Sequence, residues 1–136
     1  MKVVISMPHD AQSHAQLWME YALADLAVAR IPLPAESKYE ILLFHAQQAV
    51  EKSFKAVLTR YEIDFPYTHN LQRLLELIPV ALGQRELLLS STSLSEFAVI
   101  TRYPGELEPV TFERYKDFLS LAENIYAWAL KVVSED

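Results

Sequence analysis

Four polar side chains recur at steps of three and four residues in the segment 44–56, and they could bind a negatively charged group. They are His45, Gln48, Lys52 and Lys55. That spacing aligns them along one face of a helix. Two ammonium groups and an imidazole on one face could contact a phosphate or an acidic partner. The alternative is that these long side chains only cover the solvated side of the helix.

A second possible contact lies at Arg102-Tyr103-Pro104. The residue before a proline is biased toward extended backbone, so Tyr103 should end a helix. A cation at that position offsets the negative end of the helix dipole, which is a sufficient structural reason for Arg102. The functional interpretation is that the helix tip presents the Arg102 guanidinium to a phosphate.

A polar three-residue motif and a single aspartate lie outside these two groups. Thr68-His69-Asn70 marks a helix start, with Thr68 as the expected N-terminal cap and His69 as a candidate for an anion contact. Asp25 falls in a mostly apolar segment, and a buried carboxylate needs a partner. We expect a lysine or arginine from a neighbouring helix to pair with Asp25 in a structural role.

Several kinds of site are excluded by the residue types. The chain has no cysteine, so disulfides and thiolate metal sites are impossible. The four histidines are scattered and form no metal-binding helical pair, so we expect no metal site. With two glycines there is no glycine-rich phosphate loop, and no nucleophile elbow is present. We therefore expect neither a metal nor a cofactor.

Composition limits the partners of the chain. A net charge of −6 does not attract nucleic acid, so any such contact needs a local basic patch. An apolar content of 51% is at the top of the usual range and suggests that some apolar surface serves a subunit interface. No apolar run approaches the ~18 residues that span a bilayer, and the start is too short for a signal peptide. We expect a cytoplasmic protein with no membrane contact.

Helices must position these side chains, because the apolar residues recur with a helical period and most prolines fall at junctions. We predict an N-terminal tail over residues 1–12 and one domain over residues 13–134. The predicted helices cover Ser13 to Ala29, Ser37 to Tyr61, a short segment from Thr68 to Pro79, a stretch between Gln84 and Thr101, and Thr111 to Val133. The predicted fold class is all-α, an up-and-down bundle of four long helices plus a short fifth helix.

Taken together, these segments resemble the HEPN domain (higher eukaryotes and prokaryotes nucleotide-binding). The resemblance runs from about Ser13 to Val133, and its main parts occur in the family's order. Those parts are Trp18, Ala22, Asp25-Leu26 and Ala29, then Phe44 to Lys52 with Lys55-Ala56, then Thr68 to Leu71 with Leu74-Leu75, then Arg102 to Pro104. The resemblance implies a helical bundle, often a homodimer. It also implies a minimal nucleotidyltransferase as partner, frequently in a toxin–antitoxin pair.

Other members of that family are metal-independent ribonucleases in which four to six residues separate an arginine from a histidine. The residues four to seven positions after Arg102 are Glu106, Leu107, Glu108 and Pro109, none of them a histidine, and no other arginine has a histidine at that spacing. The obvious general acid or base for a 2′-hydroxyl attack is therefore missing. His69 or His45 could replace it only if the fold brings one beside Arg102.

The resulting hypothesis is a binding module, a dimeric helical bundle that serves as the non-catalytic partner of a nucleotidyltransferase. Its expected contacts to a nucleotide, an RNA, a phosphate or an acidic partner surface are Arg102, Tyr103, His69, Lys52, Gln48, His45 and Lys55. Two alternatives remain open from the sequence. One is a divergent metal-independent ribonuclease, and the other is a structural dimer without a ligand.

Overall fold

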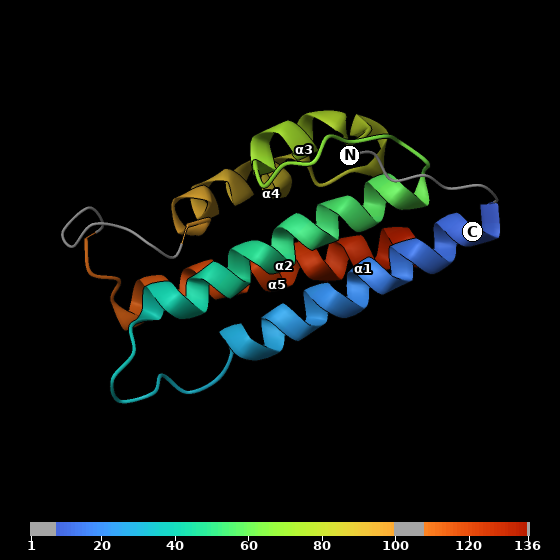
Figure 1. The fold of residues 1–136 in the computed structure, drawn as a ribbon. Helices are drawn as coiled ribbons and strands as arrows, with labels where there is room; N and C mark the ends of the chain where they lie inside the picture. Colours follow the sequence, from blue (N-terminus) through green and yellow to red (C-terminus); the bar gives the residue numbers. More distant parts are fainter. Residues whose placement is uncertain (1–7, 100–107, 136) are drawn as a thin grey trace.

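A computed structural model describes residues 8–99 and 108–135, and every regular element in those ranges is helical. The long helices are α1 (Pro8–Ala29), α2 (Tyr39–Arg60) and α5 (Phe112–Ser134). Between α2 and α5 lie α3 (Leu71–Leu77), the 3₁₀ helix η1 (Val80–Leu82), α4 (Arg85–Ser90) and the 3₁₀ helix η2 (Ser91–Phe97). Figure 1 shows the three long helices side by side, with the short helices on the other side of α2 from α1. The all-α bundle predicted from the sequence is confirmed.

The central element is α2, because it packs against α1, α5, α3 and η2. Its apolar stripe enters the core as predicted. The packing also buries polar residues of α2, namely Gln47, Glu51, Ser53, Lys55 and Thr59. A buried polar group is costly unless it finds a partner. The partners of these buried groups therefore define the polar side of the bundle.

Two helices begin elsewhere than predicted. α1 begins at Pro8 and not at Ser13, so residues 8–12 are helical and do not belong to a tail. A proline suits the first turn of a helix, because its missing N–H is not needed there. α2 begins at Tyr39, two residues after the predicted start at Ser37, and its N-cap residue Lys38 makes no side-chain capping bond.

Side-chain caps position the starts of α3 and α5. The predicted cap of α3, Thr68, is wrong, because Asn70 occupies that position and accepts a bond from the Arg73 backbone N–H at 3.2 Å. The Thr68 hydroxyl instead accepts from the Asn70 N–H. At α5 the cap is Thr111, the first residue of the predicted range, and its hydroxyl accepts from the Arg114 N–H at 3.1 Å.

A tighter helix replaces most of the predicted fourth long helix. After α4, the hydroxyls of Ser91, Thr92 and Ser93 each donate to the carbonyl three residues earlier, at 2.6 to 2.9 Å. Such local bonds compete with the regular α-helical ladder. The segment accordingly continues as η2. Gly83 separates η1 from α4 with φ of 81°, a left-handed conformation that glycine adopts without steric cost.

Candidate functional site

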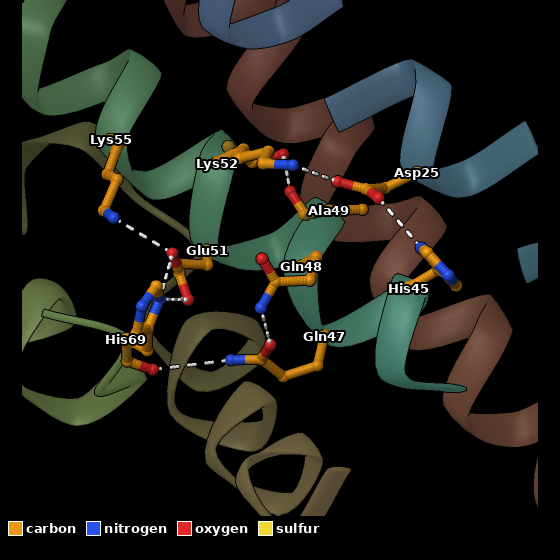
Figure 2. Close-up of polar contacts among 10 residues, drawn as sticks. Asp25, His45, Gln47, Gln48, Ala49, Glu51, Lys52, Lys55 and His69 are labelled. Atoms are coloured by element: carbon orange, nitrogen blue, oxygen red, sulfur yellow. Dashed lines mark hydrogen bonds and ion pairs between the residues drawn. The ribbon is translucent and has the colours of Figure 1, made fainter. Parts of the chain in front are cut away.

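Asp25 of α1 joins two members of the polar face of α2 (Figure 2). Its Oδ1 lies 3.0 Å from Nδ1 of His45, and its Oδ2 lies 2.5 Å from Nζ of Lys52. The expected pairing of Asp25 with a cation from a neighbouring helix is confirmed by Lys52. We call Asp25, His45 and Lys52 the Asp25 cluster.

Glu51 of α2 joins the next two cations in the same way (Figure 2). Its Oε2 lies 2.9 Å from Nζ of Lys55, one helical turn on, and 3.0 Å from Nδ1 of His69. His69 lies on the segment that leads into α3. We call Glu51, Lys55 and His69 the Glu51 cluster.

Lys55 is almost fully buried, which corrects the interpretation of this residue as part of a solvated face. A buried ammonium group must be paired, and Glu51 supplies the carboxylate. Its Nζ also lies 5.6 Å from the ring centroid of Trp18 and 5.9 Å from that of Tyr67. Both distances are within the range of a cation–π contact. Lys55 therefore lies below the surface of the site and stabilises the Glu51 carboxylate there.

The two clusters have the same construction, and Gln48 lies between them (Figure 2). In each cluster a carboxylate bridges a lysine and Nδ1 of a histidine. An ionised carboxylate only accepts, so Nδ1 carries the proton and Nε2 remains without a partner among the described residues. Gln48 donates to Gln47, which donates in turn to the backbone carbonyl of His69. The result is a polar row from α1 across α2 to the segment before α3.

Exposure differs systematically within this polar row. The carboxylate side chains of Glu51 and Asp25 are 3% and 13% exposed. The side chains of Lys52, His45 and His69 are 24%, 30% and 59% exposed. The nitrogen groups therefore lie outermost and the carboxylates lie beneath them. A ligand that approaches this surface meets the Lys52 ammonium group and the two imidazole rings first.

Five of the seven site residues predicted from the sequence come together in this row. They are His45, Gln48, Lys52, Lys55 and His69. The other two, Arg102 and Tyr103, lie outside the described residues. Sequence reasoning missed the bridging role of Glu51 and the aromatic contacts of Lys55. The available signal is the spacing of Glu51 and Lys55, which indicates an i,i+4 pair but cannot show that the pair is buried.

Two other kinds of site find no support in ranges 8–99 and 108–135. No group of three or more histidine, aspartate and glutamate side chains there could hold a metal ion. Nor does any helix of these ranges have the length and apolar character required to cross a membrane.

The chain is similar to one protein family and to solved structures with the same fold. The family model described as HEPN domain matches residues 15–133. Among solved structures, TT1696 from Thermus thermophilus is 25% identical, with 88% of this chain and 98% of that chain covered and a TM-score of 0.74. ST0689, an archaeal HEPN homologue, is 20% identical, with 96% and 100% covered and a TM-score of 0.56, a likeness of fold alone. No protein of curated function matches the chain.

Proposed function

Because this chain belongs to the HEPN domain family, we propose that it is a binding module that takes the phosphate of a nucleotide at its polar row. The observation that supports this proposal is the layering of the row. Lys52, His45 and His69 are its exposed groups, and their carboxylate partners are more deeply buried.

Phosphate suits this layering for a chemical reason. Bonds from a lysine or a protonated imidazole to phosphate are charge-assisted and stronger than neutral ones. Lys52 uses one of its three N–H groups on Asp25, so two remain for a ligand. Nε2 of His69 or His45 can donate to a phosphate oxygen when the imidazole carries a proton on both ring nitrogens. Lys55 holds Glu51 and does not touch the ligand.

A binding experiment tests this proposal directly. We expect AMP to bind the full chain in a calorimetric titration. Lys52→Gln and His69→Gln should each weaken that binding about tenfold or more, because a hydrogen bond to a charged group contributes about 1.5–3 kcal/mol. Lys116→Gln is the matched control, since Lys116 forms an exposed ion pair on α5. Absent AMP binding, or equal affinity in all variants, would contradict the proposal.

The partner in our proposal is a minimal nucleotidyltransferase, with this chain as the non-catalytic member of a toxin–antitoxin type pair. The support is family membership together with the lack of a histidine four to seven positions after Arg102. Co-expression followed by size-exclusion chromatography should give a stable complex of the two chains. Separate elution at every concentration would count against this pairing.

The Glu51–His69 pair favours a second candidate, a divergent metal-independent ribonuclease. A carboxylate that orients an imidazole through Nδ1 leaves Nε2 free to move a proton. This candidate predicts that RNA is cleaved in the presence of EDTA and that His69→Ala abolishes the cleavage. RNA that stays intact after long incubation would exclude it.

A homodimer is also part of the proposal. The second half of α1 exposes Leu23 and Val28, and Ile31 follows directly after the helix with its side chain exposed as well. We propose that these three side chains lie in the homodimer interface, because contiguous exposed apolar residues often mark a protein interface.

A further inference from the structure

A hollow of about 260 Å³ opens on the outer side of α1, beside the polar row. It is lined by His14, Leu17, Trp18 and Tyr21, which recur at helical spacing on one face. Leu17 and Tyr21 are both exposed, although they are large and mostly apolar. The surface beside the cations is thus hollowed, apolar and aromatic.

The lysines of the polar row lie against the aromatic walls of this hollow. Nζ of Lys52 is 5.9 Å from the ring centroid of Tyr21, and Nζ of Lys55 is 5.6 Å from that of Trp18. α1 itself contains no lysine or arginine. The positive charge at this edge therefore comes from α2, and the apolar surface comes from α1. A ligand with a flat apolar end and an anionic end would match both.

We infer that the hollow is the ring subsite of the ligand and takes the base of a nucleotide whose phosphate contacts Lys52. This inference rests on the proposed phosphate site, and it adds a binding site for the base of the same nucleotide. The hollow is slightly smaller than the ~300–1,000 Å³ of pockets for drug-sized ligands, so it suits a single ring system. Stacking of a base on an aromatic side chain strengthens binding roughly 5- to 150-fold.

The test compares AMP with ribose 5-phosphate, which has the phosphate and sugar without the base. In calorimetric titrations of the full chain, AMP should bind roughly 5- to 150-fold more tightly. Tyr21→Ala should abolish that difference and leave the affinity for ribose 5-phosphate unchanged. Leu17→Ala, on the same wall, should reduce the difference. Lys52→Gln should weaken both ligands, and Leu23→Ala, exposed elsewhere on α1, should affect neither.

The other outcomes separate this inference from the proposed function. Equal affinities for AMP and ribose 5-phosphate, unaffected by Tyr21→Ala, would overturn the ring subsite and leave the phosphate site standing. Failure of both ligands to bind would overturn both. If Tyr21→Ala instead changed the sedimentation of the chain, the hollow would belong to an interface with a second copy, and the ring subsite would be rejected.

Discussion

The polar row depends on a few buried charges, and Glu51 is the most constrained of them. It accepts bonds from both Lys55 and His69 while only 3% of its side chain is exposed. Desolvation of two charges is compensated only if both keep their partners. Glu51 therefore fixes the direction of an exposed imidazole and neutralises a buried ammonium group.

Removal of this carboxylate should be strongly destabilising. In Glu51→Gln, Lys55 stays buried without a counter-charge, so the free energy of unfolding should fall by about 3–5 kcal/mol in urea titrations. Glu51→Gln combined with Lys55→Met should recover most of the loss. Glu113→Gln removes an exposed pair with Lys116 and should change the value by less than about 1 kcal/mol. A loss below about 1 kcal/mol in Glu51→Gln would show that Lys55 reaches solvent.

The ionisation of Tyr115 should make the free energy of unfolding depend on pH in the alkaline range. Burial raises the pKa of Tyr115 above its ordinary value of 10.0, and the nearby Tyr39 and Glu123 raise it further. Its hydroxyl donates to the backbone carbonyl of Ala29. The folded state holds this proton more tightly than the unfolded state, so its contribution to stability is complete below about pH 10 and declines above it.

The measurement is urea unfolding at about pH 7 and again above about pH 10. Tyr115→Phe should cost about 1–3 kcal/mol at the lower pH, because the Ala29 carbonyl loses its donor. The same variant should lose less stability than the parent chain as the pH rises. Tyr61→Phe, at an exposed position, should follow the parent chain. An unchanged alkaline decline in Tyr115→Phe would assign that decline to other groups.

At the scale of elements, helical periodicity predicts long helices well and their starts less well. The ends of α1 and α2 and the whole of α5 lie within one residue of the sequence-based boundaries. α1 begins at Pro8 in place of Ser13, α2 begins at Tyr39 in place of Ser37, and the cap of α3 is Asn70 in place of Thr68. Thr68 and Asn70 are both good caps, and only the path of the chain before α3 decides between them.

The candidate site was predictable in part for the same reason. The sequence spacing of His45 and Lys52 predicts that they share one face of a helix, because both lie on the same helix. It could not pair Glu51 with His69, since that contact joins α2 to a segment 18 residues further along the chain. Nor could spacing show that Lys55 is buried, because burial depends on the helices packed around α2.

The cap of α5 gives a prediction at this scale. Thr111→Ala removes the acceptor of the Arg114 N–H, so the free energy of unfolding should fall by about 1 kcal/mol. Thermal unfolding followed by circular dichroism measures the change. Ser120→Ala, at an exposed position within α5, is the control and should be neutral or slightly stabilising. Equal effects of the two substitutions would mean that α5 does not depend on its cap.

For the whole molecule, charge and apolar surface point to different partners. The net charge of −6 disfavours long polyanions, so a phosphate can be held only where the polar row presents cations. Exposed apolar side chains also occur on and just after the second half of α1, at Leu23, Val28 and Ile31. One chain could thus bind a small anionic ligand through the row and a second copy through this apolar surface.

The homodimer proposal leads to a prediction about that surface. Sedimentation equilibrium of the full chain should show a dimer, and Val28→Glu should shift it toward the monomer, because a symmetric interface places the new charge twice in apolar surroundings. Val28 is exposed, so helical circular dichroism should be retained. Leu89→Glu, at an exposed position of α4, should leave the dimer intact. A parent chain that sediments as a monomer would refute the homodimer. A dimer that withstands Val28→Glu but dissociates in Leu89→Glu would place the interface on the short helices.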